Sequence, residues 1–76
     1  MDEIRLLDVV ALLEDVEAEG LRRGEVGTVV EVFPEQPHLP KAFLVEFSDD
    51  DGAAYAFAAL RAEQLLPLYH RKRDAA

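Results

Sequence analysis

Apolar and polar residues alternate through the middle of this chain, after a glycine-rich turn. Residues 20–33 (GLRRGEVGTVVEVF) place glycines at 24 and 27 before and within a run of β-branched and aromatic residues. Such residues favour a pleated strand, and glycine permits the tight backbone that leads into it. Because alternate residues of a strand share a face, the pattern predicts one face made of Gly27, Val29, Glu31 and Phe33.

Residues 7–16 (LDVVALLEDV) fit two different elements. As a helix, the segment has one apolar face. As a strand, it is apolar on both faces and needs cover on both sides. We favour the strand, because a first strand helps to close the edges of a small sheet, whereas a lone helix leaves them open. The helical face would consist of Leu6, Val9, Val10, Leu13 and Val16.

The second half of the chain predicts three more strands. Residues 41–47 alternate with Phe43, Val45 and Phe47 inward, and the Asp-Gly of the SDDDG segment at 48–52 favours a hairpin turn. A strand over residues 53–59 follows, then a helical turn over 61–66 that Pro67 stops, and a last strand over 66–69 that can pair with the first.

Two segments are expected to be exposed loops. Residues 34–40 contain three of the four prolines and cannot continue a hydrogen-bonded ladder. Residues 14–20 are acidic and end in glycine, and Leu21 after them is expected to anchor this loop on the core. The aromatic side chains are expected to fill mostly the core. Two exceptions could form a peptide-binding groove, Phe33 and Tyr55, and the alternative is that both are ordinary core or rim residues.

These elements predict an all-β fold. We expect a small, SH3-like, partly open barrel of about five strands, with one short helical turn before the last strand. A single domain over residues 1–69 would be followed by a flexible basic tail over residues 70–76 (HRKRDAA). Seventy-six residues are enough for one such domain.

Composition and charge narrow the possible partners. The chain has no cysteine, which fits a reducing cytoplasm, and its start is acidic where a signal peptide would be basic. No apolar stretch is long enough to cross a membrane. The formal net charge is −8, and residues 1–68 hold fifteen acids against five bases. An acidic body repels nucleic acid, whose binding depends on Lys and Arg. It suits equally a chain with a basic partner and a chain whose charge only keeps it soluble, and charge alone does not separate these two.

The sequence offers no catalytic, cofactor or metal constellation. Residues from Asp49 onward do not fit a helix-loop-helix calcium-binding loop. The fifth and twelfth positions of such a loop supply oxygen ligands, and here they are Ala53 and Leu60. No Asp or Glu lies near His38 or His70 at the spacing of metal ligands, so we interpret both histidines as surface residues and not as a metal site. Ser48 and Thr28 have no neighbouring histidine to activate them. We therefore expect a protein that is not an enzyme.

The order of these signals resembles a known family. The segments at 8–15 (DVVALLED), 20–32 (GLRRGEVGTVVEV), 45–47 before an Asp-Gly turn, and 64–68 (QLLPL) are similar to a bacterial family catalogued as domain of unknown function 4926. The similarity covers about residues 7–68. It implies a short cytoplasmic protein with an SH3-like barrel, and membership of small gene pairs with toxin–antitoxin or immunity roles. The loop at 34–40 and the basic tail depart from the family pattern.

The functional expectation is a protein-interaction module. An acidic loop and an acidic hairpin would steer a basic protein partner, and the open sheet edge and the first strand make a homo-oligomer a second outcome. The alternative is nucleic-acid binding through Arg22, Arg23 and the tail residues Arg71, Lys72 and Arg73. The candidate partner-binding residues are Glu14, Asp15, Glu17, Glu19, Arg22, Arg23, Phe33, Asp49, Asp51 and Tyr55.

Overall fold

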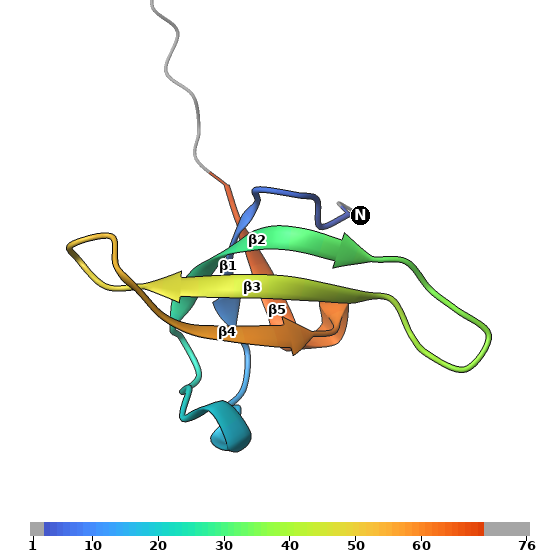
Figure 1. Cartoon of the computed structure of the whole chain (residues 1–76), viewed down its shortest axis with the longest axis horizontal. Helices are drawn as coiled ribbons and strands as arrows, with labels where there is room; N and C mark the ends of the chain where they lie inside the picture. Colours follow the sequence, from blue (N-terminus) through green and yellow to red (C-terminus); the bar gives the residue numbers. More distant parts are fainter. Residues whose placement is uncertain (1–2, 70–76) are drawn as a thin grey trace, which may run out of the picture.

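Five antiparallel strands form one curled sheet in the computed structural model, which describes residues 3–69 (Figure 1). The strands are β1 (Val9–Leu12), β2 (Val26–Phe33), β3 (Ala42–Ser48), β4 (Ala54–Leu60) and β5 (Leu65–Leu68). Two 3-10 turns complete the order, η1 (Glu17–Glu19) between β1 and β2 and η2 (Ala62–Gln64) before β5. The predicted all-β, partly open barrel with a helical turn before the last strand is confirmed. The turn ends at Gln64, however, and Pro67 lies within β5, so the predicted stop at Pro67 is wrong. β5 tolerates the proline because it is an edge strand, where a missing N–H leaves no neighbour unpaired.

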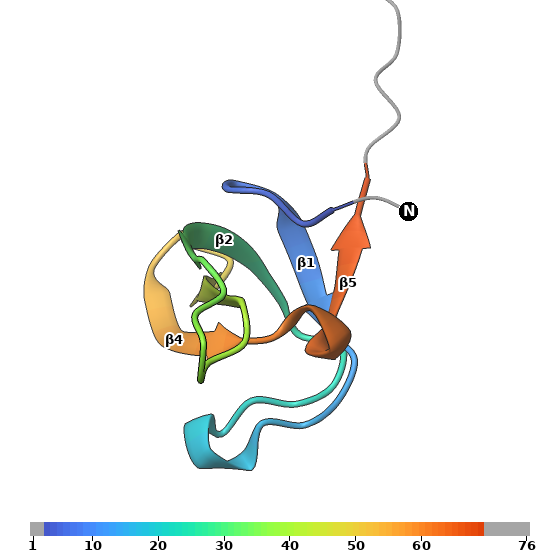
Figure 2. The same cartoon turned by 90° about the vertical axis from the view of Figure 1, so that its right-hand side faces the viewer.

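The sheet runs in the order β4-β3-β2-β1-β5, so the first and last strands pair as predicted. Figure 2 shows the sheet curling between β4 on one side and the β1–β5 pair on the other. Residues 9–12 form a strand and not a helix, which confirms the preferred reading of the 7–16 segment although the strand is shorter. The tail residues 70–76, including His70, Arg71, Lys72 and Arg73, lie outside the described residues.

The core lies inside the curl and is wholly apolar among the described residues. Phe43, Val45 and Phe47 point inward from β3, as the alternation predicted, and Leu21 anchors the acidic loop with 3% of its surface exposed. Pairs of inward residues on neighbouring strands close the core over several layers. The buried side chains are Ile4, Val10, Leu12, Leu21, Val29, Phe43, Val45, Phe47, Ala58, Leu60 and Leu65.

A β-bulge overturns the face predicted for β2. Val29 lies opposite Val45 but Glu31 lies opposite Leu44, so Val30 is an extra residue on this strand. The extra residue shifts the alternation by one position. Beyond it, Val32 packs against the core, whereas Glu31 and Phe33 are exposed. The prediction that Glu31 and Phe33 share the face of Gly27 and Val29 is therefore wrong.

The two glycines of the second strand have different roles. Gly24 has a φ of 93°, in the left-handed region, and ends the turn before the strand. Gly27 lies where strands approach closely, since a Cβ there would be 2.6 Å from Val45 Cγ1 and 2.7 Å from the backbone oxygen of Glu46. Gly27 is thus required for packing between β2 and β3.

The aromatic residues are less buried than expected. Phe43 and Phe47 are in the core, but half of the surface of Phe57 is exposed, and Tyr69 is exposed as well. The inward positions of β4 are taken by Ala58 and Leu60, and Ala56 packs against the same core. The expectation that the aromatics mostly fill the core is wrong for these two, while Phe33 and Tyr55 are exposed as predicted.

Candidate functional site

The topology gathers acidic residues at one end of the sheet. β1 and β3 both end there, so the loop over residues 13–25 and the hairpin over residues 49–53 are neighbours. η1 also contacts β4 directly. These two segments carry eight carboxylates against two arginines, which leaves six negative charges. We call this end, made of residues 13–25 and 49–53, the acidic end.

Some of these carboxylates stabilise the loops themselves. Asp15 Oδ1 accepts a 2.8 Å hydrogen bond from the backbone N–H of Arg23, and Glu14 Oε2 accepts one of 3.2 Å from Gln64 Nε2. Asp49 Oδ1 accepts bonds from the N–H groups of Asp51 and Ala53, which closes the hairpin. Glu14, Asp15 and Asp49 therefore each have a structural role.

Other carboxylates face solvent with no protein partner. Glu17 and Glu19 on η1 and Asp50 and Asp51 at the hairpin tip are exposed, and none has a hydrogen bond or ion pair through its carboxylate among residues 3–69. Sequence reasoning named Asp51 and missed Asp50. Within a run of three aspartates, only the turn geometry shows that Asp49 is the residue that folds back.

Tyr55 joins β4 to the acidic end. Its hydroxyl donates a 2.6 Å hydrogen bond to Glu25 Oε1, while Glu25 Oε2 accepts a 2.7 Å bond from the N–H of Arg22. The hydroxyl of Tyr55, and next the Arg22 N–H, lower the pKa of Glu25, and the bond to the carboxylate raises the pKa of Tyr55. Glu25 thus remains charged, and Tyr55 is held at the acidic end.

Arg22 and Arg23 lie in the same turn, and their side chains are exposed. The backbone N–H of Arg22 donates to Glu25, and that of Arg23 donates to Asp15, so each arginine has a carboxylate bonded to its backbone. Two cations among eight carboxylates do not make a positive surface of the kind that attracts phosphates.

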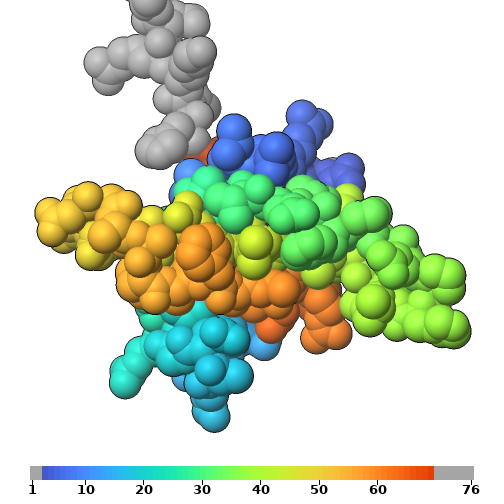
Figure 3. Space-filling view, in the orientation of Figure 1, coloured from blue at the N-terminus to red at the C-terminus, as the bar shows by residue number. Residues whose placement is uncertain are grey.

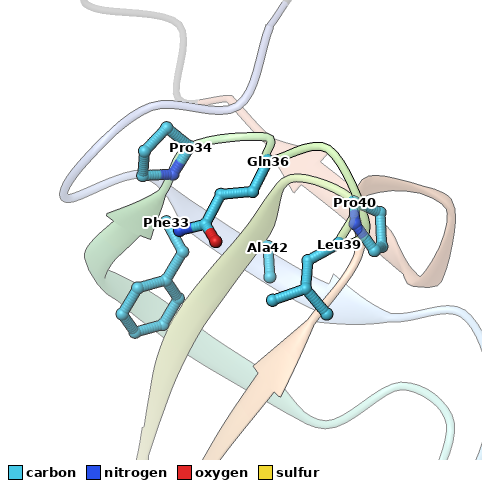
Figure 4. Close-up of a pocket in the computed structure, with 6 residues that line it drawn as sticks. All are labelled: Phe33, Pro34, Gln36, Leu39, Pro40 and Ala42. Atoms are coloured by element: carbon cyan, nitrogen blue, oxygen red, sulfur yellow. The ribbon is translucent and has the colours of Figure 1, made fainter.

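Phe33 lies away from the other candidates. It ends β2 at the opposite end of the sheet, where the loop over residues 34–41 turns through paired bonds between Gln36 and Leu39 of 2.9 and 3.1 Å. This loop and Phe33 form a hollow of about 380 Å³. Figure 4 shows the side chains that line it. The structure therefore does not place Phe33 and Tyr55 in one groove. The hollow is lined by Phe33, Pro34, Gln36, Leu39, Pro40 and Ala42.

Residues 3–69 contain no group of three His, Cys, Asp or Glu side chains placed to hold a metal ion. No helix of these residues is long and apolar enough to span a membrane.

Comparison with known proteins places the chain in a family. Residues 6–67 match the family described as "Domain of unknown function (DUF4926)". The chain belongs to this family. The match confirms the similarity noted in the segments at 8–15, 20–32 and 45–47 and in residues 64–67 of the last one. It covers all five strands except the last residue of β5. No curated protein and no solved structure matches the chain.

Proposed function

We propose that this protein is a non-enzymatic interaction module whose acidic end binds a basic protein, in the manner of an antitoxin or immunity protein that neutralises a basic partner in the cytoplasm. The observation that carries this proposal is the gathering of eight carboxylates at one end of the sheet. Four of them, Glu17, Glu19, Asp50 and Asp51, have no partner among the described residues.

Charge of this kind acts by attraction and orientation. A surface of one sign raises the rate at which an oppositely charged protein associates, and it disfavours partners of like charge. Carboxylates that are free of internal bonds lose no protein contact when they pair with Lys or Arg of a partner. The rigid sheet supports the two segments, since Leu21 buries the base of the loop and Asp49 closes the hairpin.

The test compares two charge reversals that change the net charge equally. Immobilised wild-type protein, the variant E17K/E19K and the control E31K/E35K are each exposed to a native cell extract. Glu31 and Glu35 are exposed like Glu17 and Glu19, but they lie beyond the bulge of β2, away from the acidic end. Retained proteins are identified and quantified by mass spectrometry.

A defined basic protein should be retained by wild type and by E31K/E35K, and its retention should fall about tenfold or more with E17K/E19K. Equal loss in both variants would mean that only net charge matters, and unchanged retention would mean that the acidic end does not bind. Either result overturns the proposal. A labelled RNA oligonucleotide, tested at low and high salt, should not bind; salt-sensitive RNA binding would favour the alternative through Arg22 and Arg23.

A further inference from the structure

The two edges of the sheet differ in their capacity to pair with another strand. β5 has four residues and contains Pro67, which has no N–H to donate. β4 has seven residues (AYAFAAL) with neither proline nor charge. Proteins commonly protect sheet edges with proline, lysine or short strands. β4 has none of these protections, and its one irregularity, the extra residue Tyr55, lies near the start of the strand. The stretch from Ala56 to Leu60 is therefore the edge open to pairing.

The alternation of backbone hydrogen bonds along β3 shows which N–H and C=O groups of β4 point away from β3, towards the open edge. The N–H of Asp49 donates a 2.9 Å bond to the C=O of Ala53, so Asp49 faces β4. The register shift between Phe47 and Ser48 places its extra residue, Tyr55, on β4, so the alternation along β3 is unbroken. In antiparallel pairs alternate residues bond to the same neighbour, and residues 47, 45 and 43 therefore face β4 as well. Their partners are Ala56, Ala58 and Leu60. Phe57 and Ala59 consequently direct their N–H and C=O groups to the open edge.

The surroundings of this edge are aromatic and acidic. The side chain of Phe57 is half exposed and lies directly opposite Glu46. η1, with Glu17 and Glu19, contacts β4, and Figure 3 shows this segment directly beside β4 in the space-filling view. Asp50 and Asp51 stand at the turn that leads into the strand. A strand arriving here meets negative charge on two sides.

The negative charge around the β4 edge favours one of two possible binding partners over the other. A second copy of the chain would bring its own acidic end against the first, and like charges across an interface are unfavourable. An extended segment with lysine or arginine would bond to the edge through its backbone and pair its side chains with the carboxylates. An aromatic face such as that of Phe57 also attracts cations.

We propose that the open edge of β4 binds an extended, basic segment of a partner protein as an added strand, with the N–H and C=O groups of Phe57 and Ala59 as its hydrogen-bonding groups. This inference rests on the proposed function, because it specifies how the acidic end would hold a basic partner. The backbone supplies pairing, and the charges around the edge supply selectivity.

The probe is a short peptide in which lysine alternates with valine, compared with a peptide in which glutamate replaces lysine. Binding is followed by fluorescence anisotropy, and hydrogen exchange of individual amides is followed by NMR. Two substitutions of Ala59 measure how much its backbone N–H contributes to peptide binding. Ala59→Pro removes the outward N–H without touching the bonds to β3, whereas Ala59→Val keeps the N–H and adds similar apolar bulk.

The lysine peptide should bind and should slow exchange of the Phe57 and Ala59 amides, and Ala59→Pro should weaken binding by about tenfold, since one hydrogen bond is lost and the edge is blocked. Ala59→Val should bind as wild type, and the glutamate peptide should not bind. If Ala59→Pro does not fold, the exchange measurement on wild type decides alone.

Binding of the lysine peptide without slower exchange at Phe57 and Ala59 would overturn edge docking, as would absence of binding or equal binding of the glutamate peptide. The proposed function is judged separately by the extract experiment. If E17K/E19K loses a basic partner while the β4 amides exchange as fast with peptide as without it, the proposed function stands. Only the proposal that the partner adds a strand to β4 is then overturned.

Discussion

The hydroxyl of Tyr55 donates a 2.6 Å hydrogen bond to Oε1 of Glu25, and this bond joins the edge strand β4 to the turn that precedes β2. The two strands are separated in the sheet by β3, so the bond spans a gap that backbone pairing does not close. The ring of Tyr55 lies 6.4 Å from that of Phe47, tilted by 44°, which is a favourable aromatic arrangement. Tyr55 thus connects the core, the edge strand and the acidic end.

Tyr55→Phe is expected to lower the free energy of unfolding by at most about 1 kcal/mol, because a hydrogen bond between solvent-accessible groups contributes little net stability. The variant keeps the ring against Phe47 and removes only the hydroxyl. Urea unfolding of Tyr55→Phe, Glu25→Ala and the double variant gives the coupling energy of the pair. Strictly additive losses would show that the bond contributes nothing to stability.

The stabilisation by this bond should depend on pH in a defined window. The pKa of Glu25 is lowered by folding, so its contribution is present above its ordinary pKa and is lost as pH falls through the lowered value. The pKa of Tyr55 is raised, so its contribution is present below about pH 10 and is lost as pH rises through the raised value. The stability difference between wild type and Tyr55→Phe should therefore be largest near neutral pH.

Urea midpoints of both proteins measured near neutrality, in acid and in alkali check this window. The difference should shrink towards both extremes. A difference that stays constant from acid to alkali would contradict a bond between a charged carboxylate and a neutral phenol. Glu3, whose pKa is lowered by the 2.6 Å bond from Lys41, titrates in both proteins and cancels from the comparison.

Most of the fold could be predicted from the sequence because turn residues and alternation act locally. The Asp-Gly turn and the inward set of β3 need only neighbouring residues. The β2 bulge could not be predicted in this way. Val30 looks like any strand residue, and the extra position exists because β2 must curve around the core, which depends on contacts with β3.

The candidate site was predictable in composition but not in arrangement. The acidic segments were visible in the sequence, yet their meeting at one end follows from the strand order. Phe33 and Tyr55 were correctly expected to be exposed, but the two residues lie at opposite ends of the sheet. The difference between structural Asp49 and free Asp50 depends on the direction of one side chain in a turn.

Gly27→Ala should lower the free energy of unfolding by about 1–3 kcal/mol through overpacking. The new methyl would meet Val45 Cγ1 and the backbone oxygen of Glu46, and backbone cannot rotate away as a flexible side chain can. Thr28→Ala, one position along the same strand, is the control and should lose less than about 1 kcal/mol. Urea unfolding measures both variants, and equal losses would show that β2 and β3 separate freely to admit the methyl.

Truncation of Phe47 should cost far more stability than truncation of Phe57. Phe47 is fully buried, so Phe47→Ala should cost about 3–5 kcal/mol. That is a large part of the roughly 5–15 kcal/mol that stabilises a domain, and we expect the variant to be largely unfolded in circular dichroism and thermal melting. Phe57 is half exposed, and Phe57→Ala should change stability by only about 0.5 kcal/mol.

The same pair of variants separates stability from binding. Because the Phe57 side chain borders the open edge of β4, Phe57→Ala should remain folded and bind the lysine–valine peptide more weakly than wild type. Anisotropy titrations measure this effect, and the melting curve of the same sample shows that the variant is folded. Unfolding of Phe57→Ala would make this residue part of the core, as its aromatic character alone predicts. Unchanged peptide binding in a folded variant would restrict the contact to the backbone of β4.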